Sequence, residues 1–333
     1  MVEGTEGSHH KEGSTKMTET TTIAAGIDVA KAKLDIAIDG LKQRFEVANG
    51  EAGFRDLSKF IRRHKVTRIG IEATGGYERD VVEHLRKQGF VVIVLQPIQV
   101  RAFAQFVLSR AKSDRIDAGL IAACVAYRDN FRQPPDPRLT PLADLLTFIE
   151  QTEEDIARTK IRLEHARNKD QRRLLVADVK RLAKRRTRML ANLTAAVRAH
   201  DDLATRLNLV MTIDGIGERT ALALIIRMPE LGRLSREQAA CLAGVAPFVH
   251  DSGERRGQRH IAGGRARLRK SVYAATVPAA FQWNAQLIAL YQRLIAAGKP
   301  PKLALIACVR KLIIYANTVL ARGTPWITTN APA

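Results

Sequence analysis

Cysteine and aromatic residues are scarce in this chain of 333 residues. The three cysteines, Cys124, Cys241 and Cys308, are far apart and show no C-x-x-C spacing, which argues against a disulfide framework and a structural zinc site. Each falls in an apolar stretch, where cysteine behaves as a small core residue of a protein in a reducing compartment. Aromatic residues make up only 5% of the chain, so we do not expect a surface built to stack on bases.

Acidic residues are too few to balance the basic ones. The chain has 54 lysine and arginine residues against 34 aspartate and glutamate residues, a formal net charge of +20 and a pI near 10.4. Self-repulsion of this size predicts a polyanionic partner, and nucleic acid is the usual one. A membrane surface is the competing polyanion, but we find no apolar run of transmembrane length and no apolar secretory leader. We therefore expect a cytoplasmic protein that does not contact a membrane.

The front of the chain predicts an α/β domain over residues 23–132. Residues 1–22 lack apolar periodicity, and we interpret them as a disordered leader. The pattern that follows predicts strands at 23–29, 34–39 and 44–49, a helix at 51–64, a strand at 68–73, a helix ending near 86, a strand at 90–95, and a helix from 97 to about 131 that is interrupted near 109–113. This order predicts a mixed sheet of the ribonuclease H-like type, with the first strand central and the fourth beside it.

Four acidic residues occupy positions in this order where they could meet. They are Asp28 on the first strand, Glu72 at the end of the fourth strand, and Asp114 and Asp117 at the start of the last helix. Taken singly, each has an ordinary interpretation, because aspartates cap helix starts and polar residues end strands. Asp114 and Asp117 share a helix face, where like charges are unfavourable without a cation or a proton. Together the four predict a site for two divalent cations that assist phosphoryl transfer, and their hard oxygen ligands favour Mg²⁺.

A linker followed by long helices is expected over residues 133–204. The proline-rich segment 133–141 should stop a helix and stiffen the chain. Glycine and proline are absent from 142 to 200, which predicts two helices with a break near 168–171. An apolar seam from Leu174 to Val197 has coiled-coil-like spacing and predicts self-association. The basic face beside it predicts a nucleic-acid contact through Lys184, Arg185 and Arg188, although a charge run is by default a solvated face.

The last region, residues 205–325, predicts a mainly helical domain, followed by a tail at 326–333. Gly215 and Gly217 precede a helix that starts near Glu218, the layout of a helix-hairpin-helix turn whose backbone N–H groups hold a phosphate. Two helices, at about 268–297 and 300–322, are expected to close the chain.

A glycine-rich basic loop at 250–270 holds a candidate nucleophile. Ser252 stands near arginines that could stabilise charge on a phosphoryl oxygen while the serine attacks a phosphodiester. D-S-G is also an ordinary turn sequence, and that alternative stays open. The candidate nucleic-acid-binding residues of this loop are Arg255, Arg256, Arg259, Arg265 and Arg267.

Seven short motifs in order resemble one family over residues 23–322. They are G-I-D-V-A-K (26–31), I-E-A-T-G-G-Y (71–77), K-S-D-R-I-D-A (112–118), I-D-G-I-G-E-R-T-A (213–221), L-A-G-V-A-P (242–247), D-S-G (251–253) and G-G-R-A-R-L-R-K-S-V-Y (263–273). Together they resemble the DEDD-type insertion-sequence transposases of bacteria and archaea, relatives of the Piv invertase that are understood as RNA-guided recombinases.

This resemblance implies a RuvC-like domain in front, a coiled-coil dimerisation segment and a C-terminal transposase domain. The acidic tetrad would be Asp28, Glu72, Asp114 and Asp117, and the nucleophile would be Ser252. The family implies a structured non-coding guide RNA that pairs with double-stranded donor and target DNA. It also implies a homodimer or homotetramer in which one subunit supplies the tetrad and another the serine.

Two other functions are compatible with the same residues. A RuvC-like metal-dependent nuclease or junction resolvase would use water as the nucleophile and leave Ser252 as a turn residue. An architectural nucleic-acid binder would need the basic helices but not the four acidic residues.

Overall fold

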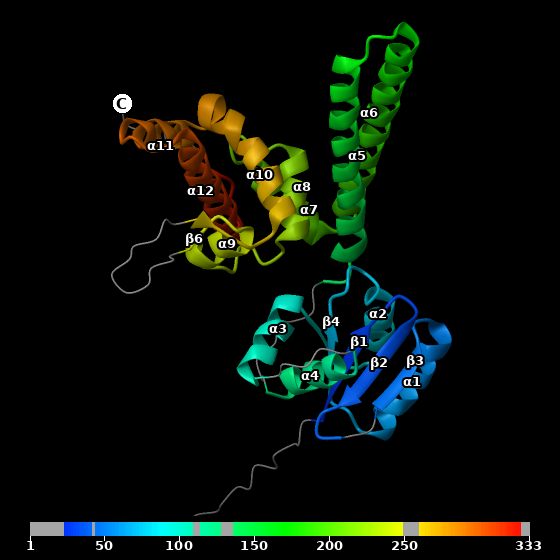
Figure 1. The fold of residues 1–333 in the computed structure, drawn as a ribbon. Coiled ribbons are helices and arrows are strands. Elements are labelled where there is room, and N and C mark those ends of the chain that lie inside the picture. Colours follow the sequence, from blue (N-terminus) through cyan, green and yellow to red (C-terminus); the bar gives the residue numbers. More distant parts are fainter. Residues whose placement is uncertain (1–22, 42–43, 109–113, 128–135, 249–259, 328–333) are drawn as a thin grey trace, which may run out of the picture. The chain divides into compact units, whose positions relative to one another are not determined.

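The computed structural model describes residues 23–41, 44–108, 114–127, 136–248 and 260–327, without the side chains of 114–116. The chain forms two compact units that divide between Pro135 and Asp136 (Figure 1). The first is an α/β unit and the second is mostly helical. The expected α/β sheet followed by a mainly helical region is therefore confirmed.

A five-stranded mixed sheet forms the centre of the first unit. Its strands are β1 (Ala24–Val29), β2 (Lys33–Ile38), β3 (Arg44–Ala48), β4 (Arg68–Glu72) and β5 (Val92–Leu95), in the spatial order β3-β2-β1-β4-β5. β1, β2 and β3 pair antiparallel as a meander, whereas β4 and β5 run parallel to β1. β1 is central and β4 lies beside it, as the sequence predicts.

Helices cover both faces of this sheet. Strand residues alternate between the faces, so Ala25, Ile27 and Val29 of β1 all point to one side. There they share a core with the apolar sides of α1 (Glu51–Arg63) and α2 (Arg79–Lys87). The opposite face carries α3 (Pro97–Phe106) and α4 (Asp114–Tyr127).

Two glycines let α4 lie directly on the sheet. Gly26 of β1 and Gly70 of β4 are paired neighbours. A Cβ atom added to Gly26 would lie 2.1 Å from the Ala118 carbonyl oxygen and 2.3 Å from the Ala122 nitrogen. At Gly70 it would lie 2.4 Å from a Val125 methyl group. The helix backbone therefore approaches β1 more closely than any side chain would allow.

The second unit begins with a helical hairpin. Its arms are α5 (Leu139–His165) and α6 (Lys169–Arg198), which pack along each other (Figure 1). Asn168 caps α6 by accepting hydrogen bonds from the Asp170 and Gln171 backbone nitrogens, which explains why the break falls where the sequence predicts it. The apolar seam is buried at Leu182, Leu193 and Val197, whereas Leu174 near the hairpin tip is 63% exposed.

Shorter helices and one small ribbon complete this unit. They are α7 (Asp201–Met211), α8 (Glu218–Arg227), α9 (Arg236–Ala243), strands β6 (Pro247–Phe248) and β7 (His260–Ile261), α10 (Ala266–Pro278), the π-helix η1 (Ala279–Trp283), α11 (Ala285–Ala296) and α12 (Pro301–Arg322). One hydrophobic core joins them to the start of α5 and the end of α6, and it includes Leu146, Leu193, Leu207 and Leu312.

Two expected boundaries are wrong. The proline-rich linker does not run to Pro141, because α5 begins at Leu139 and holds Pro141 in its first turn, where a missing N–H costs nothing. The expected helix at 268–297 is three elements, since Pro278 ends α10 and Asn284 starts α11. Asn284 accepts a hydrogen bond from the Leu287 nitrogen and donates one to the Asp214 carbonyl oxygen, 3.0 Å away.

One described helix, α12, is long and apolar enough to cross a membrane by length and composition alone. The sequence analysis found no such run. Half of its most apolar window is buried, and Cys308, Leu312 and Ala316 belong to the core of the second unit. These contacts are those of a central helix in a globular domain.

Gly26→Ala is expected to destabilise the first unit by about 1–3 kcal/mol, because backbone atoms of α4 cannot move aside as a flexible side chain would. Urea unfolding followed by circular dichroism measures this loss. Gly50→Ala is the matched control, since Gly50 has an extended φ of −177° and nothing within 4 Å of an added Cβ. Equal stability of the two variants would contradict the close helix–sheet contact.

Candidate active site and nucleic-acid interface

Asp28 and Glu72 lie on the face of the sheet that α4 covers. Asp28 is two residues beyond Gly26 on β1, and Glu72 is two residues beyond Gly70 on β4, so each shares the face of its glycine. The parallel register pairs Gly26 with Gly70 and Ile27 with Ile71, which leaves Asp28 and Glu72 as the next neighbours along the two strands. Both residues are partly buried.

The start of α4 brings the second acidic pair to the same face. Asp117 immediately precedes Ala118, whose carbonyl oxygen lies against Gly26. Asp114 is the first residue of α4, one turn before Asp117, and its side chain lies outside the described atoms. The structure therefore brings three of the four predicted acidic residues to one region by strand register and helix packing.

Two further carboxylates, which the sequence analysis missed, lie in the same row. Asp35 of β2 is directly opposite Asp28, and Glu46 of β3 is directly opposite Asp35. Directly opposed like charges are unfavourable. The Lys33 ammonium group offsets them, because it lies 3.0 Å from both the Asp35 and the Glu46 carboxylates. Its hydrogen bonds to Glu46 and Asp35 raise the pKa of Lys33.

The donor chemistry of this row suits a hard divalent cation, because every candidate ligand is a carboxylate oxygen. Among the side chains that the structure describes, no group of three or more His, Cys, Asp or Glu residues is arranged as a metal site. The residues thus fit a divalent metal by the type of their donor atoms, while the described side chains do not themselves form a ligand group.

The predicted nucleophile, Ser252, lies outside the described residues, as do Arg255, Arg256 and Arg259. The described residues on either side of this segment pair with each other, because Phe248 of β6 is opposite His260 of β7 in a two-stranded antiparallel ribbon. α10 begins six residues after His260.

Three basic residues after the ribbon have partners inside their own domain. Arg265 makes a two-pronged ion pair with Glu230, with nitrogen–oxygen distances of 2.6 and 2.8 Å. Arg269 donates through Nη1 to the carbonyl oxygens of Gly263 at 2.8 Å and Gly244 at 3.2 Å. Arg267 pairs with Glu150 at 3.1 Å. The predicted nucleic-acid contacts Arg265 and Arg267 therefore hold the start of α10 in place in this structure.

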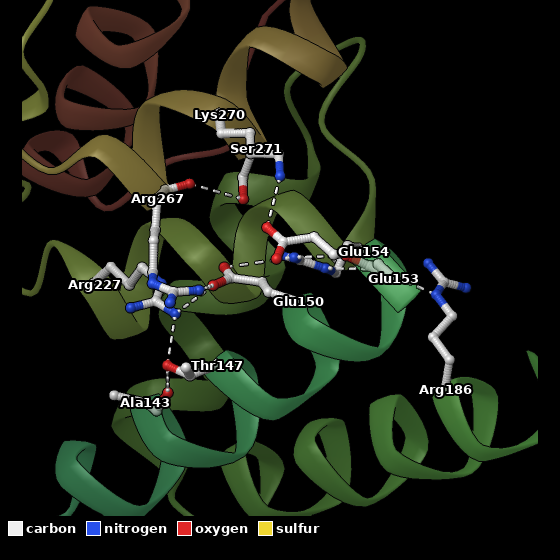
Figure 2. Close-up of polar contacts among 11 residues, drawn as sticks. Ala143, Thr147, Glu150, Glu153, Glu154, Arg186, Arg227, Arg267, Lys270 and Ser271 are labelled. Carbon is white, nitrogen blue, oxygen red and sulfur yellow. Dashed lines mark hydrogen bonds and ion pairs between the residues drawn. The ribbon is translucent and has the colours of Figure 1, made fainter. Parts of the chain in front are cut away.

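Glu150 of α5 is the centre of a cluster of charges (Figure 2). Its carboxylate is buried, with 8% of the residue exposed. Arg227 of α8 donates to Oε2 at 2.7 Å, Arg267 of α10 donates to the same atom at 3.1 Å, and the Arg219 Nη2 atom lies 3.5 Å from Oε1. The sequence offered no signal for this cluster, because isolated Glu and Arg residues on helices are usually solvated.

Glu153, one turn further along α5, extends the cluster. It accepts hydrogen bonds from Arg219 at 3.0 Å and from Arg186 of α6 at 3.0 Å. Burial by itself would raise the pKa of the Glu153 carboxyl, but the hydrogen bonds and charges of these two arginines outweigh burial, so its pKa lies below the ordinary value.

The helix-hairpin-helix candidate lies between α7 and α8. Gly215 has a φ of +93°, and an added Cβ would lie 2.3 Å from the Ala279 methyl group, so this glycine packs against η1. Gly217 is the N-cap of α8, and nothing lies within 4 Å of an added Cβ. The structure thus gives Gly215 a packing role and leaves Gly217 on the open side of the turn.

On α6, Lys184 and Arg188 are exposed and Arg185 is partly buried. Among the described residues, none of the three takes part in an ion pair. They are therefore available to a polyanion.

Comparison with known proteins agrees with this architecture. Residues 25–166 match the DEDD domain of IS110 transposases, and residues 207–292 match a domain described as transposase of the IS116/IS110/IS902 family. The chain is also similar to the pilin gene-inverting proteins of Moraxella bovis and Moraxella lacunata. Identity to each is 25% over 311 residues, which cover 90% of this chain and 96% of each relative.

The matches to transposase domains in both units, together with the similarity to gene-inverting proteins, define a DNA transposase, an enzyme that binds and recombines DNA. The chain belongs to the IS110 family of DEDD-type transposases, and the resemblance found in its motifs is confirmed. Transposases of this family typically use a divalent metal ion.

The stability of the second unit is expected to fall as the pH drops below about 4.5, the ordinary value for glutamate. Because the folded state lowers the pKa of Glu153, its stabilising contribution is present above that ordinary value and is lost as the pH falls through the lower folded value. Glu153→Gln should be less stable than the wild type at pH 7 and lose less stability on acidification. Thermal unfolding between pH 7 and pH 3 tests this, and parallel curves for the two proteins would contradict it.

Proposed function

We propose that this transposase cuts and rejoins DNA strands through a covalent phosphoserine at Ser252, assisted by Mg²⁺ at the acidic tetrad. The observation that carries the proposal is the shared sheet face of Asp28, Glu72 and the start of α4. The strand order β3-β2-β1-β4-β5 supports a ribonuclease H-like, RuvC-like fold for the first unit. Carboxylates gathered on one face of such a sheet are suited to hold the ions that act on a phosphodiester.

The tetrad would hold the metal through Asp28, Glu72, Asp114 and Asp117, with two ions per site. When bound, divalent ions stabilise charge on the phosphoryl oxygens. Asp35 lies beside Asp28, and its charge is offset by Lys33, so we do not include Asp35 among the proposed metal ligands.

In the serine step, the Ser252 hydroxyl oxygen would attack the phosphorus and the bond from phosphorus to the 3′ oxygen would break. The serine proton would pass to a base and the released 3′ oxygen would take up a proton. A 3′ hydroxyl of another strand would then attack the phosphoserine, restoring a phosphodiester and freeing the serine. Candidates for the base are the metal site, Asp251 and His260. His260 is exposed on β7, whereas Asp251 lies outside the described residues.

A metal-dependent nuclease or junction resolvase is the second candidate function, because the acidic face would serve hydrolysis equally well. The two relatives are named for inverting a pilin gene. Inversion requires that cut strands be rejoined, and a covalent intermediate conserves the bond energy for that step. This favours strand exchange over hydrolysis.

Trapping of a protein–DNA adduct tests the mechanism. Wild-type protein with Mg²⁺ and donor DNA should form an adduct that resists denaturation, whereas Ser252→Ala should form none. Asp28→Asn should bind DNA but reduce cleavage at least about 100-fold, since it removes a ligand at the centre of the sheet. An adduct in Ser252→Ala would remove the serine from the mechanism, and free ends without any adduct in the wild type would establish hydrolysis.

The partners that the family resemblance implies are double-stranded donor and target DNA, a structured guide RNA and further copies of this chain, acting in the cytoplasm of a bacterium or archaeon. The net charge of +20 and the unpaired Lys184, Arg185 and Arg188 support a polyanion on α6. Exposed Leu174 near the hairpin tip supports self-association of the α5–α6 hairpin as a coiled coil in a homodimer or homotetramer.

Protein purified from cells that carry the whole insertion element is expected to retain one structured RNA species, identified by extraction and sequencing. Ribonuclease treatment should abolish strand exchange, and adding the RNA back should restore it. The matched control is deoxyribonuclease treatment before donor DNA is added, which should leave the activity unchanged. Full activity after ribonuclease treatment would exclude a guide RNA.

A further inference from the structure

The acidic side of α5 contacts two other helices of the second unit through charged groups. Glu150 pairs with Arg227 of α8 and with Arg267 of α10, and Glu154 accepts a hydrogen bond from Lys270 of α10 at 2.8 Å (Figure 2). The hairpin is thus joined by side-chain charges to the helix that follows the β6–β7 ribbon.

The spacing of the two α10 pairs restricts the orientation of that helix. Glu150 and Glu154 are one turn apart on α5, and Arg267 and Lys270 are one turn apart on α10, so each pair of residues shares a helix face. Leu268 and Val272 bury one face of α10 in the core, and two ion pairs one turn apart further restrict the position and rotation of its start. Arg267 and Lys270 both lie in the first turns of α10, which follows β7 in the sequence.

The cluster contains more positive charge than its carboxylates can balance. Among the described residues, the ion pairs of Arg186, Arg219, Arg227 and Arg267 involve two carboxylates, those of Glu150 and Glu153. Among the described atoms, the buried Arg219 Nη1, Arg227 Nε and Glu150 Oε1 have no hydrogen-bond partner. Without Arg267, Glu150 would keep the hydrogen bond from Arg227 at 2.7 Å and the charge of Arg219 at 3.5 Å.

Because Arg227 and Arg219 also contact Glu150, Arg267 is free to serve a second role besides charge compensation. Its side chain is 47% exposed, compared with 15% for Arg227 and 20% for Arg219. We propose that the Glu150–Arg267 and Glu154–Lys270 pairs form a tether that fixes the start of α10 and the β6–β7 ribbon to the α5–α6 hairpin, and that Glu150 is thereby a positioning residue for strand cleavage. The connection to cleavage rests on the proposed role of Ser252, which lies in the sequence between β6 and β7.

The tether makes the cleavage rate depend on the placement of the hairpin. A shift of α5 along its axis moves Glu150 and Glu154 together, and the paired Arg267 and Lys270 transmit this shift to α10. Small displacements of a reacting group of about 1 Å can change a rate on the order of 100-fold. A hairpin that is held by a bound partner would therefore favour cleavage over a free one.

The alternative for Arg267 is a direct contact with a DNA phosphate. This contact would contribute to affinity and to the dependence of binding on salt. A tether would change the rate of cleavage and leave both of those quantities unaltered, so the two roles are separable by experiment.

The experiment compares full-length Arg267→Met, Lys270→Met and the double variant with the wild type, on donor DNA with Mg²⁺. Single-turnover cleavage should slow on the order of 10-fold in each single variant. The double variant should cleave no more slowly than the slower single variant, because loss of either ion pair already breaks the tether. The Kd for donor DNA, and its salt dependence, should stay within about twofold of the wild-type values.

Arg186→Met is the matched control, since Arg186 belongs to the same cluster but lies on α6 and does not reach α10. It should cleave at the wild-type rate. Equal slowing in Arg186→Met would show that general loosening of the cluster is responsible, and would overturn the tether. Weaker DNA binding of Arg267→Met with a salt slope reduced by about one would assign Arg267 to a phosphate. If the proposed serine mechanism is itself wrong, Ser252→Ala will still form a protein–DNA adduct, and this outcome is distinct from those of the Arg267 and Lys270 variants.

Discussion

The arrangement of the second unit depends on one buried carboxylate. Glu150 is 8% exposed, and a carboxylate at that depth destabilises a fold strongly unless cations and hydrogen bonds compensate it. Arg227 of α8 donates to it at 2.7 Å, so this compensation holds while α5 lies against α8, and Arg267 of α10 adds a further contact at 3.1 Å. The ion pairs make the docking of the hairpin specific, while apolar residues such as Leu146 and Ile149 supply most of the buried area.

In the first unit, the corresponding constraint is steric. α4 lies so close to β1 and β4 that only glycine fits at 26 and 70. This closeness has a direct consequence for chemistry, because the residues two positions further along the strands are Asp28 and Glu72. The same contact brings the start of α4, with Asp117, to the face of the sheet that carries Asp28 and Glu72. Packing therefore decides which acidic residues share this face.

Arg265 and Arg267 show where reasoning from the sequence was insufficient. A run of basic residues in a protein with a net charge of +20 predicts contact with a polyanion. The structure instead pairs Arg265 with Glu230 and Arg267 with Glu150, across 35 and 117 residues of sequence. Periodicity and local charge carry no information about partners so distant. Gly215 is similar, since its turn was predicted but its contact with Ala279 was not.

The order of strands and helices in the first unit, the break between the two long helices and the family followed from the sequence alone. They depend on local rules: apolar alternation for strands, capping at Asn168, and motifs whose residues are close together in the chain. Only the tertiary structure decided that Asp35 joins the acidic row, that Lys33 neutralises it, and that Glu150 collects arginines from two helices. The physical reason is that a carboxylate's role is determined by its burial and its neighbours in space, and chain folding brings those neighbours together from remote positions.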